Sequence, residues 1–274
     1  MQRPITISVS ATWVAPNFNL PSSINGVPVE HIVVVPPDVQ QHMREIAARG
    51  LAMGRNPRAF SKVGDSTMVW PTFLAAFDNP LLYALGPYIP LQPTITHFAG
   101  SFARASAAVR VGMQTWTEFD ATWSPAGLCY AGEGPLACEL RLHNPSFAII
   151  RLGTNDALDA RAFEKSMRRI IEYCLDNGVI PIIGSKPDRV EGPDNTINLI
   201  IYALADEYHI PLWDYDLIAE TTPGKGLQDD GIHYLTYNPH DYHLPATFTY
   251  APSLQDLTAL IMLHTVRQAV FTEQ

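Results

Sequence analysis

The stretch SFAIIRLGTND, residues 146–156, decides the fold class predicted for this chain. It begins with a nearly continuous apolar run, which is typical of a strand buried on both faces of a sheet. The run ends at Gly153, where a glycine lets the chain turn sharply. Residues 160–177 follow with apolar side chains at helical spacing, and residues 179–184 form a second apolar run. Strand, helix and strand of these lengths predict a βαβ unit in a parallel sheet.

The same alternation continues on both sides of this unit. Further strands are predicted for residues 59–63 and 210–214, and further helices for residues 37–50, 198–208 and 254–270. The first of these helices is predicted to stop at Gly50. Residues 71–130 are rich in proline, aromatic and small residues, which indicates loops mixed with short helices. The predicted fold class is α/β, with a central parallel sheet covered by helices on both faces.

Composition limits the class of protein. The chain has 274 residues, of which 47% are hydrophobic, and no shift in composition divides it. We therefore expect an N-terminal tether or arm over residues 1–25 and a single domain over residues 26–274. The net charge of −9 disfavours nucleic-acid binding, which depends on neutralising phosphates. No apolar run reaches membrane-spanning length, so no integral membrane segment is predicted. No feature of the sequence indicates an oligomeric state.

A candidate nucleophile follows the first predicted strand. The sequence Gly64-Asp65-Ser66-Thr67 places a serine where the next helix begins. The backbone N–H of such a serine points outward and can bind developing negative charge. The Gly-x-Ser-x-Gly motif of the α/β-hydrolase nucleophile is absent from the chain. The alternative interpretation is that Ser66 is only a helix N-cap.

Two further motifs supply groups that a serine nucleophile needs. Asn155, directly after the strand at residues 146–152, offers a side-chain N–H that could stabilise an oxyanion. The alternative is a turn in which Asn155 or Asp156 caps the next helix. Asp230-Gly231-Ile232-His233 offers a base and a carboxylate that fixes its tautomer, with Asp229 as a less well-spaced carboxylate. The alternative there is an exposed polar turn.

The three motifs, in this order, resemble those of the GDSL/SGNH hydrolase superfamily. Its first block contains a Gly-Asp-Ser nucleophile, its third a Gly-x-Asn-Asp sequence and its fifth an Asp-x-x-His sequence. The resemblance covers residues 60–235. It implies a flavodoxin-like three-layer α/β/α sandwich, in agreement with the alternation of strands and helices. It also implies a serine hydrolase that acts on carboxylic esters and needs neither cofactor nor metal.

The resemblance also implies the role of each motif residue. Ser66 is the expected nucleophile, His233 the base and then the acid, and Asp230 the carboxylate that orients the imidazole. The expected oxyanion donors are the backbone N–H of Ser66, the side chain of Asn155 and a glycine N–H from the second block. Gly100 is the best candidate for that glycine, and Gly112 is the fallback.

The expected substrate is a small-molecule or glycan ester, cut by a small-acyl or carbohydrate esterase. An acyltransferase on the same scaffold would use the same triad, with a sugar hydroxyl in place of water. A non-catalytic glycan-binding module is a third alternative, and the intact motif residues argue against it. Three aromatic residues in the irregular region could form a substrate wall or a sugar platform, or simply pack in the core: Trp116, Trp123 and Tyr130.

Histidines and cysteines raise the remaining hypotheses. His240 and His243 lack the spacing of a helical zinc pair, so we expect them near the cleft rather than on a metal. Cys174 lies on an apolar helical face and is predicted to be a core residue. Cys129 and Cys138 flank a loop with two glycines and a proline, and either a disulfide or two free thiols fits that pattern.

The compartment is predicted from several weak indications. A disulfide would imply an oxidising environment. Residues 1–25 lack the charged-then-apolar pattern of a signal peptide, but such a peptide is removed from mature secreted proteins. The proline-containing N-terminal segment and the low content of lysine and arginine also favour a secreted protein. We expect a secreted or extracytoplasmic protein.

Overall fold

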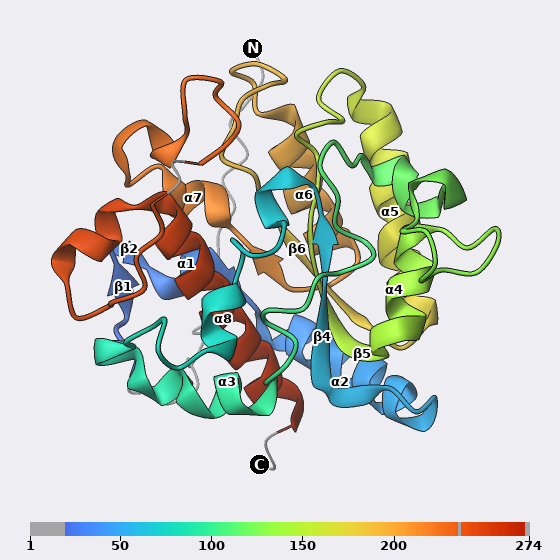
Figure 1. The fold of residues 1–274 in the computed structure, drawn as a ribbon, viewed down its shortest axis with the longest axis horizontal. Coiled ribbons are helices and arrows are strands. Elements are labelled where there is room, and N and C mark those ends of the chain that lie inside the picture. Colours follow the sequence, from blue (N-terminus) through green and yellow to red (C-terminus); the bar gives the residue numbers. More distant parts are fainter. Residues whose placement is uncertain (1–19, 235–236, 272–274) are drawn as a thin grey trace.

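The computed structural model describes residues 20–234 and 237–271 (Figure 1). Most of the predicted N-terminal arm, residues 1–19, lies outside the described residues. The remainder of that segment enters a small antiparallel hairpin, in which strand β1 (Ser23–Ile24) pairs with strand β2 (Val27–Pro28).

A five-stranded sheet forms the centre of the described part of the chain, in the order β3-β7-β6-β5-β4. Its strands are β3 (Val33–Val34), β4 (Asn56–Gly64), β5 (Pro145–Arg151), β6 (Ile180–Gly184) and β7 (Leu212–Trp213). Strands β4 to β7 are parallel to their neighbours, as predicted, and β3 pairs antiparallel with β7. Gly64 pairs with Arg151, so β4 and β5 end side by side.

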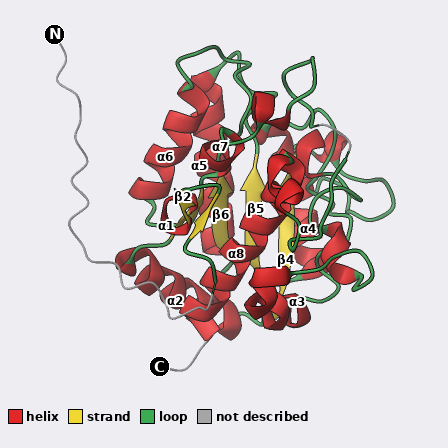
Figure 2. Cartoon of the chain, turned by 90° about the vertical axis from the view of Figure 1, so that its left-hand side faces the viewer, coloured by secondary structure: helices red, strands yellow, loops and turns green. Residues whose placement is uncertain are grey.

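Helices cover both faces of this sheet (Figure 2). One face carries α2 (Pro37–Ala52) and α8 (Ala251–Phe271). The short helices α3 (Gln92–His97) and α7 (Tyr215–Ala219) lie beside α8, and α1 (Val29–Ile32) lies beside α7. The other face carries α4 (Pro135–His143), α5 (Ala160–Asp176) and α6 (Thr196–Glu207). The fold is a three-layer α/β/α sandwich.

The central strand β5 shows why its sequence is continuously apolar. Phe147 and Ile149 join the core that contains α2 and α8. Ala148 and Ile150 join the core that contains α4, α5 and α6. Because successive side chains of a strand point to opposite faces, both sets must be apolar when helices cover both faces.

Strand β4 has a neighbouring segment on each side at its carboxyl end. Strand β5 is its neighbour on one side. On the other side, residues 108–110 pair in parallel with Gly64, whose N–H donates to the carbonyl of Ala108 (2.9 Å) and whose carbonyl accepts from the N–H of Arg110 (3.2 Å). This arrangement makes the carboxyl end of β4 a topological switch point, where ligands bind in open α/β sheets.

The segment predicted to mix loops and short helices does so. Residues 71–130 contain the short helix α3 and four 3₁₀ helices: η2 (Ala75–Asp78), η3 (Gly86–Leu91), η4 (Thr115–Phe119) and η5 (Ala121–Trp123). Outside that segment, 3₁₀ helices follow β4 and β7: η1 (Ser66–Met68), η6 (Pro223–Gly226) and η7 (Pro245–Thr249).

Some details of the sequence prediction were wrong. Gly50 does not end its helix, because α2 continues to Ala52. A Cβ atom at Gly50 would lie 2.1 Å from the carbonyl oxygen of Gly178, so the residue serves close backbone packing instead. Strand β7 has two residues where five were predicted. Among the described residues, every helix is too short or too polar to cross a bilayer.

Candidate active site

Ser66 is the first residue of η1, directly after β4. The cap of this short helix is Asp65, whose carboxylate accepts from the backbone N–H of Thr67 (2.9 Å) and from its hydroxyl (2.7 Å). Burial raises the pKa of Asp65, and the two hydrogen bonds from Thr67 act in the opposite direction. Because Asp65 provides the cap, the alternative role of Ser66 as an N-cap does not hold. The Ser66 side chain is free for another partner.

Distant parts of the chain fix this turn in place. The carbonyl oxygen of Thr67 accepts from Arg151 Nη2 and from Gln255 Nε2, each at 3.1 Å. A Cβ atom on Gly64 would lie 2.6 Å from the Met68 sulfur and 3.0 Å from the carbonyl oxygen of Arg151, so a larger residue where β4 enters the turn would require Met68 to move. The sequence motifs gave no indication of the contacts from β5 and α8.

Arg151 also connects the turn to the loop that carries His233. Its side chain is buried. Its Cζ lies 5.4, 5.0 and 5.7 Å from the ring centroids of Trp213, Tyr215 and Tyr234. Cation–π attraction is strongest where the cation is desolvated. Since Tyr234 directly follows His233, one guanidinium contacts both the serine turn and the histidine loop.

The Asp230–His233 turn is held by its own carboxylate. Asp230 Oδ1 accepts from the backbone N–H groups of Ile232 and His233, both at 2.9 Å, and Oδ2 lies 2.7 Å from His233 Nδ1. The hydrogen bond with the His233 ring and these two backbone hydrogen bonds lower the pKa of Asp230 to about 2. The carboxylate that contacts the imidazole is therefore Asp230 and not Asp229.

The two turns meet at the carboxyl edge of the sheet. His233 Nε2 lies 3.0 Å from Ser66 Oγ, across a sequence separation of 167 residues. With the Nδ1 proton directed to Asp230, Nε2 is the acceptor for the serine hydroxyl. The side chains of His233 and Asp230 are 47% and 46% exposed. The structure thus brings together the three residues that the sequence singled out, at a site that water can reach.

Asn155 lies in the turn after β5 and is joined to the segment after residue 110. Its Nδ2 donates to the carbonyl of Met113 (3.0 Å), and its own carbonyl accepts from Gln114 Nε2 (2.5 Å). The side-chain amide carries two N–H groups, so one remains after the bond to Met113.

Asp156 anchors the same two segments to each other. Its carboxylate accepts from the Thr115 backbone N–H (3.0 Å) and hydroxyl (2.6 Å). Burial raises the pKa of Asp156, and these hydrogen bonds from Thr115 partly offset that effect. The side chain that caps α5 is Asp159, which accepts from the N–H of Ala162 at 2.9 Å. The alternative in which Asn155 or Asp156 caps that helix is therefore wrong.

Gly100 does not fit the role expected of it. Its N–H donates to Asp78 Oδ1 at 2.7 Å and is not available to a substrate. Gly112 comes shortly after the residues that pair with Gly64 and directly before Met113, which contacts Asn155. Among the described residues, the hydrogen bonds include no acceptor for the N–H of Gly112 or of Ser66.

A small cavity of about 220 Å³ opens beside the Ser66 hydroxyl and the His233 ring. Its wall combines apolar side chains with amides and hydroxyls: Thr67, Val69, Thr72, Phe73, Tyr234, Asn238, Pro252 and Gln255. The sequence motifs did not predict several of these residues as part of the site, because they come from η1, from the loop after it and from α8.

His240 and His243 each pair with a different aspartate. His240 Nε2 lies 2.8 Å from Asp256 Oδ2 in the interior, and His243 Nδ1 lies 3.0 Å from Asp241 Oδ1 at the surface. The two rings therefore have different carboxylate partners. Neither histidine lines the cavity beside His233, so the expectation that both lie at the cleft is not met.

The three aromatic residues in question lie in different environments. Trp123 lines a second pocket, together with Arg104 and Arg110. Trp116 is half exposed, and its Nε1 donates to Gln114 Oε1 at 2.6 Å. Tyr130 is exposed, and the Arg141 guanidinium lies 3.8 Å from its ring centroid.

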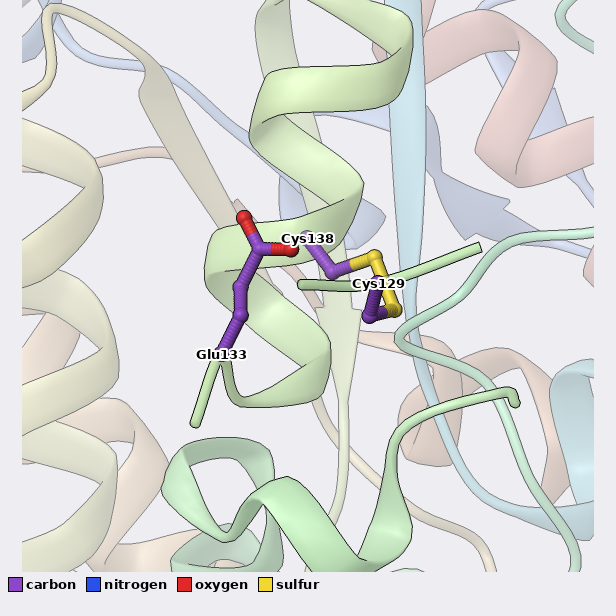
Figure 3. A group of neighbouring side chains, drawn as sticks. All are labelled: Cys129, Glu133 and Cys138. Atoms are coloured by element: carbon purple, nitrogen blue, oxygen red, sulfur yellow. A yellow bond between two sulfur atoms is a disulfide. The ribbon is translucent and has the colours of Figure 1, made fainter. Parts of the chain in front are cut away.

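Cys129 and Cys138 form a disulfide that joins the preceding loop to α4 (Figure 3). The carboxylate of Glu133 lies near both sulfurs but bonds to Arg141, at 2.8 and 2.6 Å. With the sulfurs bonded to each other, these three residues offer no thiolate ligand. Cys174 is a buried free cysteine, which confirms its predicted place in the core.

Fold and site together define a class of protein: an α/β/α sandwich with a Ser–His–Asp hydrogen-bonded chain at the carboxyl edge of its sheet. Neither a protein-family model nor a curated protein matches the chain.

Several solved structures are similar to it at low sequence identity. A GDSL-like lipase from Bacteroides thetaiotaomicron has 13% identity and a TM-score of 0.44, over 82% of this chain and 98% of that one. The esterase EstA from Pseudoalteromonas sp. has 14% identity and a TM-score of 0.44, over 76% and 97%. A carbohydrate esterase family 3 protein from Talaromyces cellulolyticus has 15% identity and a TM-score of 0.46, over 75% and 98%.

Proposed function

We propose that this chain is a serine esterase of the GDSL/SGNH hydrolase superfamily. The observation that carries the proposal is the hydrogen-bonded chain from Ser66 through His233 to Asp230. Nucleophilic catalysis by serine needs a base within hydrogen-bond reach and a third group that orients the base. The nucleophile, the base and the orienting group in this proposal are all residues that the order of motifs had singled out.

In the first step, Ser66 Oγ attacks the ester carbonyl carbon and His233 Nε2 takes the hydroxyl proton. The resulting imidazolium is stabilised by the carboxylate of Asp230, which the low pKa keeps ionised. The tetrahedral intermediate collapses when His233 donates the proton to the leaving alcohol oxygen. The C–O bond of the ester breaks, and an acyl group remains on Ser66.

Three donors surround the position of the developing oxyanion in this proposal. They are the N–H groups of Ser66 and Gly112 and the remaining side-chain N–H of Asn155. Gly112 and Asn155 are held together through Met113. Donors fixed before the reaction stabilise the transition state without paying reorganisation at the moment of charge development.

In the second step, water attacks the acyl group, with His233 again as base, and the acid is released. The exposure of His233 and Asp230 favours water as the acceptor over a transfer reaction that excludes it. The cavity beside Ser66 is about 220 Å³, below the usual 300–1,000 Å³ of drug-sized ligand sites. This size supports a small group, such as a short acyl chain, next to the nucleophile.

The proposal is tested with p-nitrophenyl acetate and with an organophosphate. Wild-type protein should hydrolyse the ester and be labelled once per chain, with the label on Ser66 by peptide mass spectrometry. Ser66→Ala should lose the label and on the order of 10⁴-fold or more in kcat.

Ser23→Ala serves as the matched control, because this exposed serine lies in strand β1 and lines neither the cavity beside Ser66 nor the pocket that contains Trp123. It should keep both labelling and turnover. Labelling at another residue, or turnover that survives the loss of the Ser66 hydroxyl, contradicts the proposal.

A further inference from the structure

Two further pockets adjoin each other on the Arg110 side of the serine turn. The nearer one, of about 300 Å³, includes Met68, Val69 and Trp70, which follow Ser66 in the chain. The farther one, of about 610 Å³, includes Trp123. They share four residues and so form a continuous surface, here called the Trp70–Trp123 groove: Ala105, Ser106, Val109 and Arg110.

The charge of this groove is opposite to that of the whole protein. Its lining contains Lys62, Arg104 and Arg110 and, among the described residues, no aspartate or glutamate. The chain as a whole carries a net charge of −9. A cleft lined by one sign of charge concentrates ligands of the other sign.

Arg110 is the cation of this set that remains available to a ligand. Arg104 is paired with the buried carboxylate of Glu139. Lys62 is buried and donates to the carbonyl of Phe102 at 2.9 Å. Arg110 is exposed and forms no ion pair within the described residues.

The guanidinium of Arg110 is held in a defined position against Trp123, and its backbone is tied to the end of β4. Its Cζ lies 5.1 Å from the ring centroid of Trp123, and Nη1 donates to the carbonyl of the same residue at 3.3 Å. Its backbone N–H donates to the carbonyl of Gly64, two residues before Ser66. A guanidinium fixed by stacking loses less entropy when it forms a bidentate bond to a carboxylate.

Two aromatic side chains complete the groove, Trp70 exposed and Trp123 partly buried. The Trp70 side chain is 58% exposed where the groove approaches Ser66, and Trp123 lies in the farther pocket. Flat aromatic faces provide apolar contact for the C–H face of a sugar ring, while Arg110 provides the donors for an acidic substituent. A carboxylate-bearing sugar ring matches both features.

We propose that the Trp70–Trp123 groove binds a sugar ring bearing a carboxylate, as part of the ester cleaved at Ser66. This inference rests on the proposed esterase function and specifies its substrate class as acidic glycan esters. Arg110 would be the residue that selects the acidic ring over a neutral one.

The test compares two acetyl esters that differ only at C6, which is a carboxylate in one and a neutral hydroxymethyl group in the other. Methyl glucuronoside and methyl glucoside, each acetylated at the same hydroxyl, are assayed by acetate release. We expect wild-type protein to prefer the acidic ester by about tenfold in kcat/KM at low salt, and less at high salt because ions screen an exposed charge. Arg110→Gln should abolish the preference while leaving hydrolysis of p-nitrophenyl acetate within twofold.

Arg58→Gln is the matched control for Arg110→Gln. Arg58 is also an exposed arginine with one bond to a backbone carbonyl, that of Thr96 at 3.4 Å, but it lies near the start of β4. The control should retain the preference for the acidic ester. Equal kcat/KM values for the two esters in the wild type, or a preference that persists in Arg110→Gln, would overturn the inference.

A binding measurement separates failure of this inference from failure of the esterase proposal. Ser66→Ala protein is titrated with methyl glucuronoside, which contains no ester, and with methyl glucoside. Calorimetry or NMR should show saturable binding of the acidic sugar that Arg110→Gln weakens about tenfold. Binding without any esterase activity would refute the proposed function alone, and turnover of p-nitrophenyl acetate without acidic-sugar binding would refute the groove alone.

Discussion

Two His–Asp pairs in this molecule have nearly the same contact distance and opposite surroundings. His233 and Asp230 are about half exposed and lie 2.7 Å apart, whereas His240 and Asp256 are 9% and 1% exposed and lie 2.8 Å apart. The second nitrogen of His233 faces Ser66 Oγ. Asp256 instead also accepts from the backbone N–H of Leu74, at 2.9 Å.

The difference shows that a short His–Asp contact does not by itself identify a catalytic pair. The His240–Asp256 pair joins two loops to α8, which is a structural task. The His233–Asp230 pair has a hydroxyl and solvent at its open side, which is what proton transfer requires. The predictions below test this division of roles.

The largest expected effect is on turnover. His233→Ala should lower kcat by on the order of 10⁴-fold or more, because no base then accepts the Ser66 proton. His240→Ala should stay within about tenfold of wild type, since its ring contacts no group of the triad. Steady-state kinetics with p-nitrophenyl acetate measure both. Comparable losses of kcat in the two variants would contradict the assignment of His233, and not His240, as the catalytic base.

His243→Ala provides the control for exposure alone. This histidine forms a third His–Asp contact, 64% and 47% exposed, with no serine opposite it. Turnover should be unchanged in that variant.

A smaller loss of turnover is expected at the oxyanion site. Asn155→Ala should lower kcat by about 10²–10³-fold while KM changes little, because the amide acts on the charge that develops in the transition state. The same kinetic assay measures the effect. A change confined to KM would show that Asn155 binds the ground state and would contradict its proposed role.

The glycine that supplies the third donor can be identified with a matched pair of variants. Gly112 and Gly100 have similar positive φ angles, +78° and +88°, and neither has an atom within 4 Å of an added Cβ. Gly112→Ala and Gly100→Ala should therefore cause similar backbone strain. Only Gly112→Ala should lower kcat, by about tenfold, because only that strain displaces a donor to the oxyanion. A larger loss in Gly100→Ala would restore the original expectation from the sequence.

Stability should show the reverse order of the two histidines. His240→Ala should lower the free energy of unfolding by about 1–3 kcal/mol, because the buried Asp256 carboxylate loses a partner. His233→Ala should change it by less than about 0.5 kcal/mol, as expected for an exposed side chain. Urea denaturation followed by fluorescence gives both values. Equal losses of unfolding free energy would show that the His233–Asp230 pair stabilises the fold as much as the His240–Asp256 pair does.

The smallest expected effect concerns the titration of Asp230. Its pKa is lowered from 3.8 to about 2 by hydrogen bonds from His233 and from two backbone N–H groups. Since the folded pKa is the lower one, the stabilisation by ionised Asp230 is present above pH 3.8 and is lost as the pH falls toward 2. In an NMR titration, the midpoint of the Asp230 carboxyl carbon should rise in His233→Ala. An unchanged midpoint would assign the shift to the backbone donors alone.

Much of the fold was predictable because local patterns agreed with it. The apolar run at residues 146–152 indicates a strand buried on both faces, and the spacing of apolar residues after residue 160 indicates a helix buried on one face. The antiparallel strand β3 and the short length of β7 were not predictable, since two-residue strands carry too little pattern. Gly50 was misassigned because its reason is contact with Gly178, far away in the sequence.

The candidate site divides in the same way. Ser66, Asn155, Asp230 and His233 lie in short motifs whose residue types indicate their chemistry. Gly100 was preferred to Gly112 because the sequence cannot show that residues 108–110 pair with the end of β4.

The sequence by itself determined the alternation of strands and helices and the identity of three polar turns, because these depend on neighbours within a few residues. Only the tertiary structure decided which turns meet and, within the described residues, whether Gly100 or Gly112 keeps an unpaired N–H and which cation of the Trp70–Trp123 groove has no carboxylate partner. Those outcomes depend on contacts such as the one between Gln255 and Thr67, which join residues remote in the chain. Hydrogen bonding and desolvation act over a few ångströms of space, whatever the sequence separation.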